Sequence, residues 1–180
     1  MNYCEYCETL EKDNLHKIYH DTTYGFSVTQ DSELFGRLIL EINQAGLSWG
    51  TILKKQNNFR EAYGKFDLKT VASYKEKDIR RLLSNSGIIR NKLKIHAIIY
   101  NARQIIKLQE SHGSFKMWLD LQYPLSKDEW VQLFKSIFKF TGGEITNEFL
   151  LSIGYLKGAH KDNCRINKNI MHLRPKWMNN

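Results

Sequence analysis

The sequence contains no run of 18 apolar residues, and its first 13 residues, MNYCEYCETLEKD, lack the basic and apolar regions of a secretory signal. The first absence excludes a transmembrane helix, and the second leads us to expect a cytoplasmic protein. Cysteine is also scarce, and the three residues Cys4, Cys7 and Cys164 cannot all pair with one another. In a reducing compartment they indicate free thiols or metal ligands rather than a disulfide framework.

Proline and glycine are few, with 2 and 11 residues among 180. This argues against collagen-like, disordered and turn-rich all-β chains. Apolar residues make up 42% of the chain, which is enough for one sizeable core. We therefore expect residues 1–180 to form a single domain.

Acidic residues are outnumbered, 19 against 27 basic ones, and the net charge of +8 is unevenly distributed. Residues 1–48 carry three basic and eight acidic side chains, a net charge of −5. Residues 75–107 carry nine basic and two acidic side chains, a net charge of +7, and residues 157–180 have a net charge of +5. A basic stretch of this kind is either a solvated surface or a phosphate-binding one. Charge alone leaves nucleic acid, a membrane surface and an acidic protein as candidate partners.

Apolar residues recur with the spacing of an α-helix along most of the chain, and no segment shows the strong alternation of a β-strand. Near residue 40, for example, Leu34, Leu38 and Ile42 fall on one helical face. The pattern predicts an all-α fold with an irregular, basic tail after Gly158. The expected helices span residues 31–45, 49–63, 67–74, 75–84, 91–109, 114–121, 127–138 and 146–155.

Two of the expected helices are joined by the tight turn Asn85-Ser86-Gly87. Gly87 permits a positive φ angle or a close backbone approach, and the two isoleucines that follow can anchor the turn in the core. The backbone N–H groups of the turn and of the next helix then suit a phosphate. Residues of about 75–109 therefore resemble a helix-hairpin-helix, which grips the DNA backbone without reading sequence, although any helical hairpin with a glycine turn has a similar pattern. The candidate DNA-binding residues are Ser86, Gly87, Ile88, Arg90, Lys92 and Lys94.

Cysteine and histidine residues gather near both ends of the chain. His160 and Cys164 are four residues apart and can reach one ion from a single helical turn, while Cys7 and His20 can supply the other half of a tetrahedral zinc site. Alternatively, Cys4 and Cys7 both join the C-terminal pair and leave His20 free, or all these side chains are reduced or solvated without a metal. Four protein ligands would make the ion structural and would tie the chain ends together. The two candidate segments span about residues 4–20 and 160–164.

Glu41 lies at the border of an apolar helical stripe, where burial of a carboxylate without a partner is expensive. It is either a boundary residue with its carboxylate in water, or an acceptor or base in a pocket. Aromatic residues lie close to it in the sequence and can belong to the core or form a stacking pocket for a flipped base. They are, with two histidines, His16, Tyr19, His20, Tyr24, Phe26 and Trp49.

Several strings of residues carry a family resemblance. They are Tyr19-His20-Asp21, Gln44-Ala45-Gly46-Leu47-Ser48-Trp49, Ser86-Gly87-Ile88-Ile89-Arg90-Asn91-Lys92, Phe138-Lys139-Phe140-Thr141-Gly142 and His160-x3-Cys164. In this order, across residues 7–164, they resemble the bacterial 3-methyladenine-DNA glycosylase I family.

The resemblance implies a fold of the helix-hairpin-helix DNA glycosylase superfamily. It implies hydrolysis of the N-glycosidic bond of 3-methyladenine in alkylated DNA, which leaves an abasic site, and one structural zinc ion per chain. The family's thirteen-residue spacing between a cysteine and a histidine ligand falls on Cys7 and His20. The remaining ligands fall on His160 and Cys164.

The resemblance also assigns the pocket. Glu41 would accept hydrogen bonds from the base and is our candidate catalytic residue. The chain departs from the family at His16, which replaces a pocket tyrosine, and at Tyr24, which replaces a tryptophan; the stretch around residues 120–132 is also shorter. The candidate base-binding residues are Tyr19, which would hydrogen-bond the base, Trp49, which would stack on it, and His16, Tyr24 and Gln44.

We therefore expect a monomeric DNA repair glycosylase that acts on damaged double-stranded DNA, with no membrane partner and no obligate protein partner. The departures at His16 and Tyr24 motivate one alternative, a non-catalytic, zinc-containing DNA-binding protein derived from the same fold. A second alternative is a zinc-stabilised protein-interaction module. The three differ in whether the protein releases a base, binds DNA without releasing one, or does not bind DNA.

Overall fold

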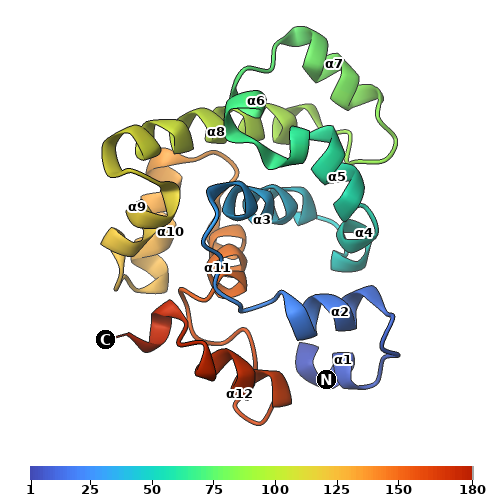
Figure 1. The fold of residues 1–180 in the computed structure, drawn as a ribbon. Helices are drawn as coiled ribbons and strands as arrows, with labels where there is room; N and C mark the ends of the chain where they lie inside the picture. The colour runs from blue at the N-terminus through green and yellow to red at the C-terminus, as the bar shows by residue number, and fades with distance from the viewer. Residues whose placement is uncertain (180) are drawn as a thin grey trace.

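The computed structural model describes residues 1–179, and within that range the regular structure is entirely helical, as predicted (Figure 1). The helices are α1 (Tyr3–Glu8), α2 (Leu15–Thr22), α3 (Asp31–Gln44), α4 (Trp49–Lys54), α5 (Gln56–Ala62), α6 (Leu68–Ala72), α7 (Glu76–Ser84), α8 (Lys92–His112), α9 (Phe115–Gln122), α10 (Lys127–Ile137), α11 (Gly143–Ser152) and α12 (Arg165–His172). Two short 3-10 helices are η1 (Gly64–Phe66) and η2 (Lys176–Met178). None of the described helices is long and apolar enough to cross a bilayer.

The core surrounds α3, which lies at the centre of the molecule with α8 on one side and α11 on the other (Figure 1). The predicted apolar stripe of α3 is buried, and Leu34, Leu38 and Ile42 are each at most 1% exposed. Burial of such side chains is the main force that holds the surrounding helices on α3. Gly46, with a φ of +81°, ends this helix in a conformation that favours glycine, and Ser48 then caps α4.

Two predictions of local structure were wrong. The single helix expected over residues 49–63 is interrupted at Lys55, which separates α4 from α5. The tail expected to be irregular contains α12, whose Ile166 and Ile170 are buried against Cys4 and Cys164. A helix of eight residues has little stability of its own, so the tertiary burial of its apolar face stabilises it.

The two ends of the chain lie side by side, with α12 next to α1 and α2 (Figure 1). Gly25 is at the junction, with a φ of +81°, and its N–H group donates to the carbonyl of Ser152. A Cβ atom at this position would come within 2.9 Å of Ala159 Cβ and 3.2 Å of His160 Cδ2. The close approach of the two ends therefore requires glycine at position 25.

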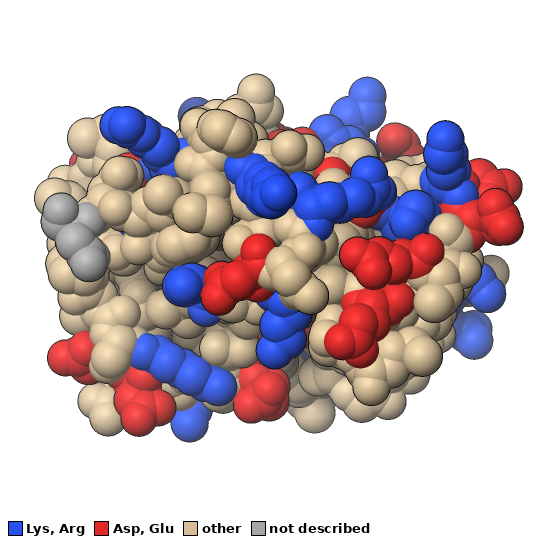
Figure 2. Space-filling model, turned by 90° about the horizontal axis from the view of Figure 1, so that it is seen from below, with Lys and Arg blue, Asp and Glu red and all other residues tan. Residues whose placement is uncertain are grey.

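Figure 2 shows the face formed by these terminal helices, on which basic and acidic side chains are mixed. Acidic side chains gather toward the side of α1, in keeping with the net negative charge of the first 48 residues. The most basic stretch of the sequence lies elsewhere, on α7 and α8 at the opposite end of the molecule (Figure 1).

Candidate functional site

A pocket of about 300 Å³ opens between α2, α3, α4 and α11, with one residue contributed by α1. Five of the six residues assigned to a pocket from the sequence meet there. The lining residues are Tyr3, Tyr19, Tyr24, Glu41, Gln44, Trp49 and Glu148.

Aromatic rings form most of the pocket wall. The ring of Tyr19 meets Trp49 edge to face with 5.0 Å between centroids, and lies 5.7 Å from the ring of Tyr24. The Tyr3 ring is perpendicular to that of Tyr24 at 5.9 Å. Burial raises the pKa of all three tyrosines well above the ordinary value, so their hydroxyl groups stay protonated and neutral. The wall thus offers flat apolar faces together with O–H groups that can donate or accept.

Glu41 is the acidic group of the pocket and comes from the middle of α3. The residue is only 5% exposed, and its carboxylate accepts no hydrogen bond from any residue between 1 and 179. Burial, together with the negative charge of Glu148, raises its pKa to about 8, and the cation of Arg37 opposes this shift. A buried carboxyl group without a hydrogen-bond partner is unfavourable in the empty protein and suits a ligand that brings donors or a positive charge.

Glu148 on α11 is a pocket residue that the sequence analysis missed. Its Oε2 accepts a hydrogen bond from the Tyr24 hydroxyl at 3.0 Å, and its Oε1 accepts one from the Asn147 side chain at 3.3 Å. The only sequence signal is an acid placed directly before the apolar residues Phe149-Leu150-Leu151. The pocket therefore contains two carboxyl groups rather than the one expected.

The structure places His16 outside this pocket and Tyr3 inside it. His16 lines a neighbouring hollow, where its ring faces Gly50. The Tyr3 hydroxyl lies 3.3 Å from His16 Nδ1 and 3.3 Å from the His16 carbonyl oxygen. The Tyr3 ring, brought in by α1, contacts both His16 and Tyr24 and contributes to the pocket wall, to which His16 does not contribute.

A second group of side chains lies next to the pocket and joins the chain ends. The four ligand atoms of Cys4, His20, His160 and Cys164 are buried and lie within 4.8 Å of one another. Cys164 Sγ is 3.6 Å from His160 Nδ1 and 3.7 Å from His20 Nε2, and Cys4 Sγ is 3.9 Å from His160 Nδ1. Sulfur and nitrogen ligands of a tetrahedral zinc ion are about 3.5 Å apart when the bonds are about 2.3 and 2.0 Å. We call these four residues the Cys2His2 cluster; it can hold a metal ion.

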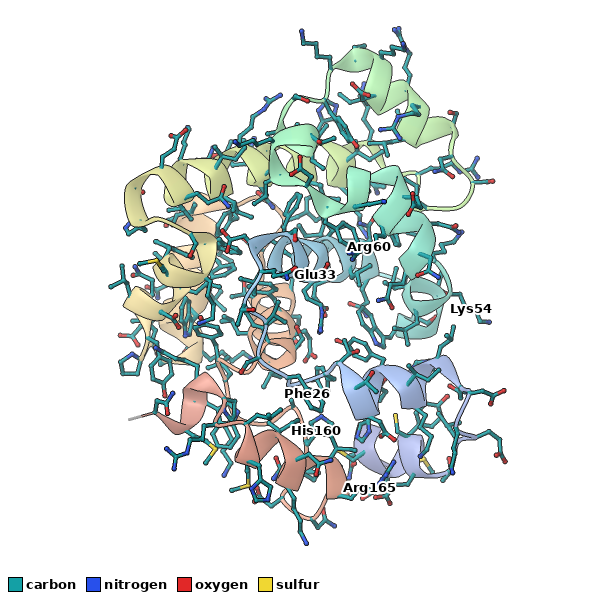
Figure 3. The ribbon with its side chains drawn as sticks, in the orientation of Figure 1. Phe26, Glu33, Lys54, Arg60, His160 and Arg165 are labelled. Carbon is teal, nitrogen blue, oxygen red and sulfur yellow. The ribbon has the colours of Figure 1, made fainter. Side chains whose placement is uncertain are left out.

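Each histidine of the cluster is oriented by a second partner. His20 Nδ1 lies 2.7 Å from Asp21 Oδ1, and His160 Nε2 lies 2.8 Å from the Tyr24 carbonyl oxygen. If each of these nitrogens carries the proton, the other nitrogen of each ring presents a lone pair to the two thiols. This arrangement of histidines held by a carboxylate and a carbonyl is typical of metal ligands. Figure 3 shows His160 between α12 and the pair formed by α1 and α2.

The cluster contains Cys4 rather than the predicted Cys7. Both cysteines are on α1, three residues apart, and both are buried. Cys7 Sγ faces away from the cluster and donates to the carbonyl oxygen of His16 at 3.6 Å. Since the two thiols are within one helical turn of each other, only the orientation of α1 decides which of them meets the C-terminal residues.

Side chains at the N-terminal end of α5 hydrogen-bond to the turn between α7 and α8. Lys55 Nζ donates to the Ser86 carbonyl oxygen at 2.9 Å, and Asn58 Nδ2 donates to that of Gly87 at 3.2 Å. Gly87 does not have a positive φ angle; a Cβ atom there would come within 3.1 Å of Asn58 Nδ2, so glycine permits the close approach of Asn58 to the turn. Ile88 is buried and anchors the turn, while Ser86 is exposed.

The basic residues that follow the turn point in two directions. Arg90 and Lys92 are exposed, beside the N-terminus of the 21-residue helix α8. Lys94, in contrast, is 5% exposed, and its Nζ donates to the carbonyl oxygens of Asn43 at 2.9 Å and Ala45 at 2.7 Å. Its ammonium group therefore stabilises the end of α3 rather than facing solvent, which does not favour the DNA-binding role expected for Lys94.

Comparison with known proteins finds the same architecture elsewhere. Residues 9–129 match the family model described as methyladenine glycosylase. The chain is 41% identical over 111 residues to DNA-3-methyladenine glycosylase 1 of Escherichia coli (strain K12), which is 62% of this chain and 59% of that protein. It is 36% identical over 109 residues to DNA-3-methyladenine glycosylase of Haemophilus influenzae, which is 61% of this chain and 59% of that protein. These alignments span about three fifths of the curated relatives.

A solved structure extends the likeness to most of the chain. The 3-methyladenine DNA glycosylase I (TAG) from Staphylococcus aureus, described for its recognition of 3-methyladenine, superposes with a TM-score of 0.79 at 32% identity. The match covers 92% of this chain and 97% of that structure. With an aromatic pocket, a buried acid and a family model that covers more than half of its residues, the chain belongs to the methyladenine glycosylase family.

Proposed function

We propose that the protein is a monofunctional DNA glycosylase that hydrolyses the N-glycosidic bond of 3-methyladenine in alkylated DNA and leaves an abasic site. The observation that carries the proposal is the buried Glu41 carboxyl group, which has no hydrogen-bond partner among residues 1–179 and faces a pocket lined by aromatic rings. A volume of about 300 Å³ suits one flipped purine. Membership of the methyladenine glycosylase family supports the choice of base.

The reaction that we propose needs little acid–base chemistry. A purine methylated at N3 in DNA carries a positive charge and is already a good leaving group. Glu41 would accept hydrogen bonds from the base, Tyr19 would hydrogen-bond it, and Trp49 would stack on its face. Negative charge in the pocket and π-faces favour the cationic base by charge and cation–π attraction. Water then attacks the sugar carbon as the glycosidic bond breaks, and no nucleophile from the protein is required.

The turn between α7 and α8 would bind the DNA backbone. Its exposed Ser86 and the backbone of Gly87 and Ile88 lie beside the N-terminus of α8, and Arg90 and Lys92 add positive charge there. Helix N-termini and cations attract phosphates without regard to base sequence. Damaged double-stranded DNA is therefore the partner that we propose, with residues of about 75–109 acting as a helix-hairpin-helix.

The Cys2His2 cluster would hold one structural zinc ion per chain. All four positions of a tetrahedral ion would be filled by protein atoms, so the ion would have no open position for water or substrate. Its contribution would be to fix α1, α2 and the C-terminal segment against one another. Since Tyr24 and Tyr3 contact histidines of the cluster, the ion would also support the pocket wall.

A base-release assay tests the proposal. Methylated duplex DNA is incubated with an excess of protein, and the released bases are identified by chromatography and mass spectrometry. We expect free 3-methyladenine from the wild-type protein and a loss of about 10- to 100-fold in Trp49→Ala, because one base–aromatic stack contributes about 1–3 kcal/mol. Trp177→Ala, in the C-terminal 3-10 helix outside the pocket, serves as the matched control and should retain full activity.

Two outcomes would contradict the proposal. Salt-dependent DNA binding without release of any base would favour the alternative of a non-catalytic, zinc-containing DNA-binding protein. Failure to bind DNA even at low salt would favour a protein-interaction module.

A further inference from the structure

The second acid of the pocket has no role in the function proposed so far. Glu148 and Tyr24 come from segments 124 residues apart, yet the Tyr24 hydroxyl donates to Glu148 Oε2 at 3.0 Å inside the pocket. The hydrogen bond needs the phenolic hydroxyl group, so the pair depends on a tyrosine at position 24.

The pair holds the Glu148 carboxylate in a fixed position. Both of its oxygens accept hydrogen bonds, one from Tyr24 and one from Asn147. The Tyr24 ring is itself fixed, since it packs perpendicular to Tyr3, and the Tyr24 carbonyl accepts from His160 of the Cys2His2 cluster. A charge that is held in this way can act on a ligand without first reorganising.

Glu41 differs from Glu148 in that it has no hydrogen bond from any described residue and is almost completely buried. Two like charges in one small pocket are unfavourable unless one carboxyl group holds a proton or a cation lies between them. The cation of Arg37 on α3 acts against the raised pKa of Glu41, while its guanidinium group donates to the Thr23 carbonyl oxygen and lies 5.9 Å from the Tyr19 ring centroid. The pocket therefore favours either a proton on one of the two carboxyl groups or a ligand that brings positive charge.

We propose that Glu148, positioned by Tyr24, is a specificity-determining residue that makes the pocket select positively charged purine lesions over neutral ones of the same shape. This inference rests on the proposed function and assigns the charge selection to a residue separate from Glu41. Glu41 hydrogen-bonds the edge of the base, and Glu148 supplies the fixed negative charge that the cation neutralises.

The raised pKa of Glu41 supports this division of roles. The carboxyl group of Glu41 holds its proton at neutral pH partly because of the negative charge of Glu148, in a surrounding of Tyr19, Tyr24 and Arg37. A protonated Glu41 presents one donor and one acceptor, which match the N7 acceptor and the exocyclic amine of adenine. Glu148 would therefore act on the ligand both by its own charge and through the proton on Glu41.

The test is a binding titration with two probes of the same shape. One is 3,9-dimethyladeninium, which carries a permanent positive charge, and the other is its neutral analogue in which carbon replaces N3. Binding is followed by tryptophan fluorescence at pH 7 in wild-type protein, Glu148→Gln, Tyr24→Phe and the control Glu144→Gln, which lies exposed one helical turn earlier on α11. Glutamine at position 148 keeps the shape and the acceptor for the Tyr24 hydroxyl.

We expect wild-type protein and Glu144→Gln to bind the cation at least tenfold more tightly than the neutral analogue. Glu148→Gln should reduce this ratio by tenfold or more with little change in affinity for the neutral probe, and Tyr24→Phe should reduce it by a smaller factor. An unchanged ratio in Glu148→Gln, with normal thermal unfolding, would overturn the inference. If wild-type protein binds neither probe and releases no base from methylated DNA, the proposed function itself fails. If it releases base but Glu148→Gln keeps the ratio, only the role of Glu148 fails.

Discussion

The molecule contains two buried polar sites that lie side by side. They differ in whether their polar side chains have hydrogen-bond partners within the protein. In the Cys2His2 cluster each histidine has a second hydrogen-bond partner, and the ligand atoms face one another at 3.6 to 3.9 Å. In the pocket, Glu41 has no hydrogen bond from any described residue, and its pKa is raised to about 8. The cluster is complete once an ion is bound, whereas the pocket remains incomplete without a ligand.

This difference assigns stability to the Cys2His2 cluster and recognition to the pocket. The cluster joins α1, α2 and α12, which have few apolar contacts of their own with the main core. The pocket lies between those helices and α3, and its buried acid is unfavourable in the empty protein. Groups that cost stability in the free protein and face a cavity are typical of binding sites.

The largest effect that we expect comes from breaking the cluster. Cys164→Ser should lose the bound metal and lower the free energy of unfolding by at least about 3 kcal/mol, which corresponds to roughly 10 °C in Tm, because ligand binding stabilises only the folded state. Thermal unfolding and elemental analysis measure this directly. Cys7→Ser, a buried thiol outside the cluster, is the matched control and should keep one zinc per chain. The opposite result, metal loss in Cys7→Ser alone, would show that Cys7 is the ligand.

An effect of similar size concerns the pH dependence of stability. Because the pKa of Glu41 is raised from an ordinary value of 4.5 to about 8, the folded protein binds more protons than the unfolded chain between these two pH values. The contribution of Glu41 is therefore fully present below pH 4.5 and is lost as the pH rises through 8, with a total of about 3–5 kcal/mol. Urea unfolding across this range should show a steeper decline for wild-type protein than for Glu41→Gln. Parallel curves for the two proteins would contradict the assignment of the buried charge.

A smaller effect should distinguish the basic turn from the acidic pocket. Arg90→Ala and Lys92→Ala should each weaken binding to undamaged duplex DNA by several-fold and reduce the slope of log affinity against log salt by about 1, since each phosphate contact releases counterions. Neither variant should alter binding of a free base. Lys127→Ala, exposed at the start of α10, is the control. Equal slopes in all four proteins would place the DNA interface elsewhere.

The helical pattern allowed most of the fold to be predicted, because long amphipathic segments such as α3 and α8 carry their own signal. The tail was not predictable in the same way: α12 is short, and its helix depends on burial of Ile166 and Ile170 against residues from the other end of the chain. The break at Lys55 likewise has no proline or glycine to mark it.

Prediction of the pocket from the sequence has a similar limit. The order of motifs was sufficient to find Glu41, Tyr19 and Trp49, but Glu148 comes from a helix with no recognisable motif, and only folding brings it to Tyr24. The choice of Cys4 over Cys7 depends on the orientation of one short helix. Lys94 could have been recognised, since it lies on the same face of α8 as the buried Ile98 and Ile105.

The most direct test of the central claim is a crystal structure of the protein with bound 3-methyladenine. We predict that the base lies in the pocket, stacked on Trp49 and beside Tyr19, with its edge toward Glu41 and the Cys2His2 cluster unchanged. A base bound outside this pocket, or a pocket that stays empty at saturating ligand while the protein releases 3-methyladenine from DNA, would contradict it.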